Sequence, residues 1–215
     1  TSSLGIDTEF VGPNLPNLPG LCEHPMPLVI SLREKTSIPV EVDSVRLEAV
    51  REQSLDEVRQ TRVQYGNKQV PLAEFFDVSG SAANDQELVW EGDCSHVKLI
   101  GSELSAGRIR VEGNAGDAVG FAMIAGTILI CGQCGIRPGA GMKRGTIALV
   151  GTDESPAMLP TFRYDCQYQP AFLRWYFQQL TRHGFCVPAE AWEANYRRHS
   201  GDLLELGKGE ILVRA

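Results

Sequence analysis

The sequence predicts a mainly β protein built around a parallel β-helix, with an α/β module on its N-terminal side and another on its C-terminal side. Thirteen of the 22 glycines lie between Gly92 and Gly151. In the same interval, strand-forming apolar residues recur every 19 residues, without an apolar stripe of helical period. A fixed period of about 20 residues is typical of solenoids, in which each repeat contacts only its neighbours.

The repeat is clearest in two consecutive rows, RIRVEGNAGDAVGFAMIAG (108–126) and TILICGQCGIRPGAGMKRG (127–145), followed by TIALVG. Ile109, Ile128 and Ile147 are 19 residues apart. Each row contains one alternating strand, so its aliphatic side chains should face the interior and its charged side chains should face outward. We therefore expect one strand per coil of a parallel β-helix.

Glycine occupies matching places in each row. Corners that need a positive φ, and coils stacked about 4.8 Å apart, both exclude a Cβ atom. The phosphate-binding pattern G-x-x-x-x-G-K-[ST] is absent, so the register favours a structural role over nucleotide binding. The glycines expected to have this structural role are Gly107, Gly113, Gly116, Gly120, Gly126, Gly132, Gly135, Gly139, Gly145 and Gly151.

Composition divides the chain into four segments. Residues 1–27 hold five of the twelve prolines and form an extended arm, which is either a free tail or lies on a partner. Residues 28–87 form the N-terminal α/β module, and residues 88–151 form the β-helix repeats, whose first unit is looser and two residues longer. Residues 152–215 form a helical and hairpin module that caps the open end of the solenoid.

Three elements are predicted within the C-terminal cap. Residues 169–183 should form an amphipathic helix, with Phe172 on its apolar face and Pro170 in its first turn. Residues 188–198 should form a second short helix. Residues 203–214 should form a hairpin whose turn is Gly-Lys-Gly.

The overall composition excludes several classes of protein. The net charge of −7 argues against a nucleic-acid or anionic-membrane surface, and no apolar run approaches the roughly 20 residues of a membrane helix. The six cysteines are too few for a disulfide scaffold. No signal peptide is visible, although the missing initial Met suggests a trimmed start, and we expect a cytoplasmic protein with reduced thiols.

Two groups of residues could carry chemistry. Cys131 and Cys134 form a single C-x-x-C, the one candidate for a metal or redox site, but a zinc site usually needs a second ligand pair. Asp93, Cys94 and His96 lie within four residues of sequence, yet neighbours in an extended segment point to opposite sides. We expect no catalytic residue, no cofactor-binding residue and no firmly assigned metal ligand in this chain.

The segments GNAGDAVGFAMIAGTI and RPGAGMKRGTI, with FFDVSG upstream, resemble the C subunits of the formylmethanofuran dehydrogenase family. The segments LPTFRY, FLRWYFQQL and SGDLLELGKGEILV look most like the C subunit of the bacterial formyltransferase/hydrolase complex. The glycine repeat alone is less specific, since the C-terminal β-helix domain of glutamate synthase shares it. The family usually has several more coils than this chain.

The resemblance implies a right-handed parallel β-helix that acts as a non-catalytic scaffold. Its partners would be amidohydrolase-like, formyltransferase-like and dehydrogenase B-like subunits. Together they would move a formyl group from formyl-tetrahydromethanopterin to a methanofuran-type carrier and release formate, a step of formaldehyde oxidation in one-carbon metabolism. Zinc, or molybdenum or tungsten, would be held by the partners. There are three alternatives. The first is a subunit of a molybdenum or tungsten formylmethanofuran dehydrogenase, which is an oxidoreductase of methanogenesis. The others are a spacer domain like that of glutamate synthase and a freestanding enzyme that uses Cys131 and Cys134.

Overall fold

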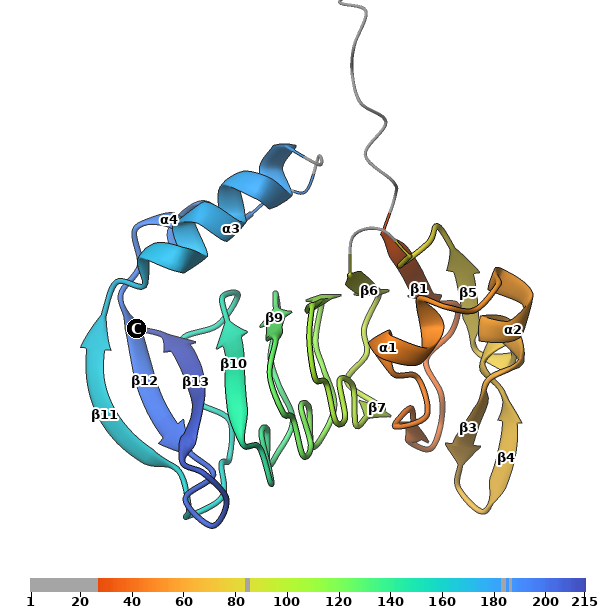
Figure 1. The fold of residues 1–215 in the computed structure, drawn as a ribbon, viewed down its shortest axis with the longest axis horizontal. Helices are drawn as coiled ribbons and strands as arrows, with labels where there is room; N and C mark the ends of the chain where they lie inside the picture. Colours follow the sequence, from red (N-terminus) through yellow and green to blue (C-terminus); the bar gives the residue numbers. More distant parts are fainter. Residues whose placement is uncertain (1–26, 84–85, 183–184, 186) are drawn as a thin grey trace, which may run out of the picture.

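The computed structural model describes residues 27–215, apart from 84–85, 183–184 and 186. The arm predicted over residues 1–27 therefore lies outside the described residues, except for Pro27. The described chain is mainly β and forms one large and one small sheet (Figure 1). The mainly β prediction is confirmed.

The large sheet contains nine strands: β1 (Leu28–Leu32), β5 (Phe76–Ser79), β6 (Glu87–Glu91), β8 (Arg108–Glu112), β9 (Thr127–Ile130), β10 (Arg144–Leu149), β11 (Arg163–Tyr168), β12 (Tyr196–Gly201) and β13 (Lys208–Arg214). Their spatial order is β11-β12-β13-β10-β9-β8-β6-β1-β5. The small sheet has the order β4-β3-β2-β7 and contains β2 (Val40–Glu41), β3 (Arg62–Tyr65), β4 (Lys68–Pro71) and β7 (Val97–Lys98).

Short helices flank the sheets. In the N-terminal part these are α1 (Leu47–Val50), α2 (Leu55–Gln60) and a 3₁₀ turn, η1 (Leu72–Glu74). Ser54 caps α2 in a reciprocal capping box with Glu57, as its position before an acidic first turn suggests. In the C-terminal part, α3 (Ala171–Arg182) lies at one end of the large sheet and is followed by α4 (Ala189–Trp192) (Figure 1).

Six neighbouring strands of the large sheet, β1, β6, β8, β9, β10 and β13, run parallel. Ile109 pairs with Ile128, and Ile128 pairs with Ile147, so the hydrogen-bonded register is the 19-residue register predicted from the sequence. The longer first unit is also visible, because Glu87 of β6 pairs with Arg108 of β8, an offset of 21. The periodic apolar pattern thus determines which strands pair, and in which register.

The segments between the strands stack as well. Parallel bridges join Cys94 to Ala115 and Ala115 to Cys134. On the opposite edge, the amide of Ala122 donates to the carbonyl of Ala140 at 2.8 Å. Fully buried aliphatic and sulfur-containing side chains fill the interior between the strands and these turns, among them Ile100, Val119, Met123, Ile128, Met142 and Ile147. The repeat therefore stacks over its whole length around an apolar interior.

The repeat glycines meet two different physical demands. Gly120 and Gly139 have φ of +66° and +67°, the left-handed conformation expected at a sharp corner. Gly116 has no positive φ, but a Cβ atom there would lie 2.4 Å from the carbonyl oxygen of Val97 in the neighbouring turn. Some glycines of the repeat are therefore required for a left-handed backbone at a turn, and others because the neighbouring turn leaves no room for a Cβ atom.

The outer face of the sheet is covered at its C-terminal end by α3. Leu129, Ala148 and Leu212 on the strands form a second apolar cluster with residues of the helix. The helix lies within the predicted range, but the prediction for Phe172 is wrong: its side chain is 41% exposed and does not join the apolar face. The buried helix residues are Leu173, Tyr176, Phe177 and Leu180.

Two further predictions for the C-terminal part are wrong. The second helix covers only residues 189–192, because the chain from Tyr196 is extended and pairs with β13. The hairpin is formed by β12 and β13, with Asp202–Gly207 between them, rather than by residues 203–214 alone. The physical reason is that β13 pairs with two strands. It is antiparallel to β12 and parallel to β10, so all seven of its residues from Lys208 are in the strand.

Candidate functional site

Cys131 and Cys134 do not converge. Cys131 packs against the outer cluster beneath α3, whereas Cys134 packs against the interior of the repeat. Burial raises the pKa of each thiol to about 12. At Cys131, the nearby charge of Arg110 lowers the pKa slightly and that of Glu112 raises it. At Cys134, the charge of Asp117 raises the pKa further. A thiol that stays protonated is a poor nucleophile and a poor metal ligand. The chain bends at Cys131 and Gly132, directly after β9, so the two thiols lie on different sides of the turn.

The Asp93–His96 segment also points in several directions. Cys94 is completely buried in the interior, and burial raises the pKa of its thiol to about 12. Asp93 points outward, where Lys35 Nζ lies 3.1 Å from its Oδ2. His96 is half-buried. The structure brings no nucleophile and base together here.

A polar ladder connects the coils at this corner of the repeat. Asn114 Nδ2 donates to Asp93 Oδ1 at 3.2 Å, and the amide of Gln133 donates to Asn114 Oδ1 at 2.9 Å. Gln133 Nε2 then donates to Glu154 Oε2 at 3.2 Å. The hydrogen bond from Lys35 lowers the pKa of Asp93 to about 2, assisted by the bond from Asn114. These hydrogen bonds join successive units of the repeat.

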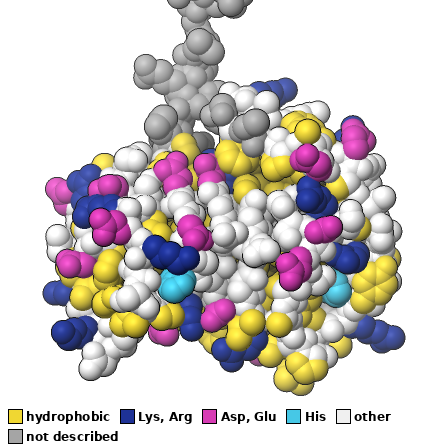
Figure 2. Space-filling view, turned by 180° about the vertical axis from the view of Figure 1, so that it is seen from behind, with side chains coloured by type: hydrophobic (Ala, Val, Ile, Leu, Met, Phe, Trp, Pro, Cys, Tyr) yellow, Lys and Arg dark blue, Asp and Glu magenta, His cyan; other side chains and the backbone are white. Residues whose placement is uncertain are grey.

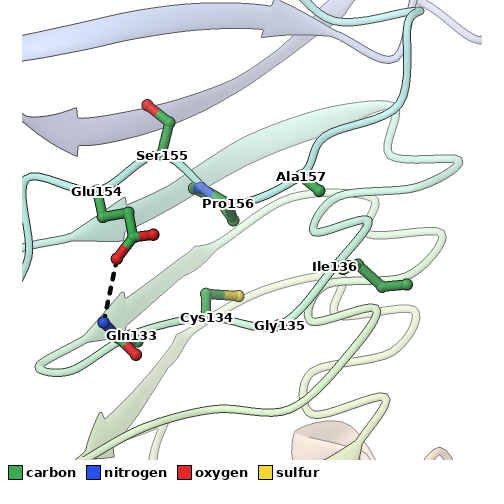
Figure 3. A pocket seen from close by; sticks show the side chains of 8 residues that line it. All are labelled: Gln133, Cys134, Gly135, Ile136, Glu154, Ser155, Pro156 and Ala157. Carbon is green, nitrogen blue, oxygen red and sulfur yellow. Dashed lines mark hydrogen bonds between the residues drawn. The ribbon is translucent and has the colours of Figure 1, made fainter.

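A pocket of about 330 Å³ lies at the end of this ladder (Figure 3). It separates the turn at Gln133–Ile136 from the segment at Glu154–Ala157, and the Gln133–Glu154 hydrogen bond spans one side of it (Figure 3). Its acidic group is already paired with an amide, and its thiol has a raised pKa. The lining residues therefore supply no activated nucleophile and no acid–base pair.

A buried ion-pair network lies between the large sheet and α3. Arg110 Nη1 is 2.9 Å from Glu87 Oε1, and Arg110 Nε is 2.8 Å from Glu112 Oε1. Tyr176 Oη donates to Glu87 Oε1 at 3.3 Å, and the Arg110 guanidinium lies 4.6 Å from the centre of the Phe185 ring. Desolvation, followed by the Glu87 charge, raises the pKa of Tyr176. Sequence reasoning missed this group, because its partners come from segments 89 residues apart.

Within the described residues, no three His, Cys, Asp or Glu side chains come together as a potential metal site. No helix of the described chain has both the length and the apolar character needed to cross a bilayer. The buried ionic group and the polar ladder are the main polar features of the repeat. Both join one element of the structure to another.

No family model matches the chain. Among curated proteins, the C subunit of tungsten-containing formylmethanofuran dehydrogenase 2 from Methanothermobacter marburgensis is 34% identical over 96 residues, covering 43% of this chain and 36% of the relative. The C subunit of molybdenum-containing formylmethanofuran dehydrogenase 1 from the same organism is 36% identical over 95 residues, covering 44% of this chain and 24% of the relative. The C subunit of tungsten-containing formylmethanofuran dehydrogenase 2 from Methanococcus maripaludis is 34% identical over 89 residues, covering 41% of this chain and 33% of the relative.

Among solved structures, a chain of the formyltransferase/hydrolase complex from Methylorubrum extorquens, determined with methylofuran, aligns with a TM-score of 0.45. Its sequence identity is 23%, and the alignment covers 87% of this chain and 99% of that chain. The similarity in sequence to the curated relatives confirms the resemblance noted above. The matched segment spans about a quarter to a third of those relatives' length, and over it this chain is similar in sequence to the C subunits of formylmethanofuran dehydrogenases.

Proposed function

We propose that this chain is a structural, non-catalytic subunit of a formylmethanofuran-processing complex. The observation that carries this proposal is the 34–36% identity to C subunits of formylmethanofuran dehydrogenases over about 95 residues. The arrangement of polar residues supports it, because the most buried ion pairs and the polar ladder join one coil or strand to the next. Catalysis, cofactors and metals are then assigned to the partner subunits.

We further propose that the repeat is a short right-handed parallel β-helix. The parallel pairing at offsets of 19, the bridges between turns and the filled interior support this proposal. Since coils of a β-helix are interchangeable, deleting residues 127–145 should leave β8 to pair with β10 and give a folded protein of lower stability. A variant that shows no cooperative unfolding and no near-ultraviolet circular dichroism would contradict the β-helix.

For the complex itself, we favour the formyltransferase/hydrolase reaction. It transfers the formyl group of formyl-tetrahydromethanopterin to a methanofuran-type carrier and releases formate. The three C-terminal segments that look like the bacterial protein support this assignment: they include the start of β11, most of α3, the turn between β12 and β13, and most of β13. The expected partners are amidohydrolase-like, formyltransferase-like and dehydrogenase B-like subunits.

The second candidate is a molybdenum- or tungsten-containing formylmethanofuran dehydrogenase, favoured by the names of the relatives. The two candidates differ in what the whole complex contains. A dehydrogenase should copurify with molybdenum or tungsten together with iron, whereas a hydrolase complex should contain zinc and a formyltransferase-like subunit. Metal analysis of the purified complex distinguishes them.

The test of the structural role is isolation of the tagged full-length chain from its native source. We expect it to copurify with an amidohydrolase-like or formyltransferase-like subunit, and to keep the activity of the complex when Cys131 and Cys134 are both replaced by Ser. Recovery as a lone monomer would overturn the proposed function. Loss of activity in an intact complex carrying the Ser variant would show instead that this chain takes part in the chemistry.

A further inference from the structure

The turns at one end of the strands of the large sheet expose several large apolar side chains. Leu204 is 82% exposed, and Leu203, Leu206, Phe121 and Ile124 are between 42% and 55% exposed. Turns of a soluble protein are usually polar, and a contiguous apolar patch on a surface generally marks a place of contact. We call these five residues the leucine edge.

The residues of the leucine edge lie on successive turns of the molecule although they come from distant parts of the sequence. The turn with Phe121 and Ile124 stacks on the next turn through the Ala122–Ala140 hydrogen bond. The β12–β13 turn follows it, since the amide of Asp202 donates to the carbonyl of Met142 at 3.2 Å. In Figure 1 these turns lie side by side along the lower edge of the molecule.

Asp202 holds the leucine turn in a fixed conformation. Its carboxylate accepts hydrogen bonds from the amides of Leu204 and Gly141, each at 3.1 Å, and its carbonyl accepts from Glu205 and Gly207. Burial tends to raise the pKa of Asp202, but the hydrogen bonds to its carboxylate outweigh this effect and lower it. A fixed turn loses little conformational entropy on binding, so its leucines are presented ready for contact.

Basic side chains border the leucine edge. Arg144 and Lys208 are register partners on β10 and β13, Lys143 precedes Arg144, and Arg163 begins β11. All four are exposed, and none forms an ion pair with another residue that the structure describes. Figure 2 shows basic and hydrophobic side chains together along this lower edge. This basic border is a positively charged region on a chain whose net charge is −7.

We propose that the leucine edge docks a partner protein subunit through an apolar patch bordered by carboxylates. This inference rests on the proposed function, which requires such a partner. The basic border gives the contact its charge complementarity, which favours acidic partner surfaces and speeds association. A membrane fits less well, because Glu205 lies between Leu204 and Leu206 and the net charge of −7 is repelled by anionic lipid.

The test is site-specific photo-cross-linking in the native complex. A photoreactive phenylalanine analogue replaces Leu204 in the tagged full-length chain, and a matched variant carries it at Trp175, which is 58% exposed on α3. We expect the Leu204 position to cross-link to an identified subunit of the complex, at a peptide with both apolar and acidic residues. The Trp175 position should give less than a tenth of that yield.

Two surface variants provide a second readout. Leu204→Ser with Leu206→Ser should lower the copurified partner at least tenfold without changing the melting curve of the chain, because both side chains are solvent-exposed. Lys143→Glu with Lys208→Glu should weaken the association to a similar extent, most strongly at low salt. Trp175→Ser is the control and should leave the partner bound.

The outcomes separate this inference from the proposed function. A complex that forms normally with both surface variants, or that cross-links only through Trp175, overturns the docking surface while leaving the structural role intact. A chain that copurifies with no other protein of the complex overturns both. Sedimentation of the wild-type chain, but not the leucine variant, with vesicles of one-third phosphatidylglycerol would assign the edge to a membrane and overturn the protein partner.

Discussion

Arg110 Nη1 lies 2.9 Å from Glu87 Oε1 on the neighbouring strand, and the two side chains are only 8% and 11% exposed. Glu87 also accepts a hydrogen bond from Tyr176 of α3, so this ion pair joins the repeat to the helix that covers it. Charges buried this deeply are tolerated only when their partners remain in place. The stability of the α3–sheet contact therefore depends on both partners.

Replacing Arg110 with Ala should lower the free energy of unfolding by about 3–5 kcal/mol, since Glu87 is left buried without its cation. The matched control is Arg33→Ala, which removes an ion pair with Asp77 whose side chains are 46% and 70% exposed. It should cost no more than about 1 kcal/mol. Urea denaturation of the full chain measures both, and equal effects would contradict the importance of the buried pair.

Gly116→Ala should destabilise the repeat by about 3 kcal/mol or more, because the new Cβ would lie 2.4 Å from a backbone oxygen that neighbouring coils hold in place. Gly141→Ala is the comparison. At Gly141 the nearest heavy atom to an added Cβ lies 3.7 Å away, and only a φ of +73° opposes the substitution, which costs about 1 kcal/mol. Thermal unfolding should rank the two variants in this order; the reverse order would contradict close stacking at Gly116.

The polar ladder predicts a specific dependence on pH. Asp93 has a pKa of about 2 in the folded chain, below its ordinary value of 3.8, so its stabilising effect is complete above pH 5 and is lost as the pH falls from about 4 to 2. Asp93→Asn should remove about 1 kcal/mol or less at pH 7, since the Lys35–Asp93 pair is exposed. The difference in stability between the wild type and the variant should shrink as the pH falls through 4 and should be much smaller at pH 2.5 than at pH 7. Urea midpoints at pH 7 and pH 2.5 measure this, and a constant difference would exclude Asp93 as the cause.

The thiols should differ in reactivity. Iodoacetamide at pH 8 should modify exposed Cys166 quickly, while Cys94, Cys131 and Cys134 react only after denaturation, because burial raises the pKa of each to about 12. Peptide mass spectrometry over a time course measures this. Rapid labelling of Cys131 or Cys134 in the folded chain would reopen the redox hypothesis, as would bound zinc that the double Ser variant loses.

Periodicity made the centre of the fold predictable. Ile109, Ile128 and Ile147 pair in the register that their spacing gives, since stacked parallel strands place equivalent residues side by side. The separation of the thiols of Cys131 and Cys134 was not predictable from their spacing alone, because the chain bends at Cys131 and Gly132. The hairpin boundaries were mispredicted because turn-forming glycines at positions 207 and 209 outweighed the strand pattern that begins at Tyr196.

By itself, the sequence determined the repeat, its register and the places where a Cβ atom cannot fit, because these depend on contacts between equivalent positions of adjacent coils. Only the tertiary structure decided that β1 and β13, from opposite ends of the chain, extend the same parallel ladder. It also brought Glu87, Arg110 and Tyr176 together and placed the β12–β13 turn against the turns of the repeat. Contacts of this kind join segments that share no period, so they depend on how the flanking modules fold back onto the sheet.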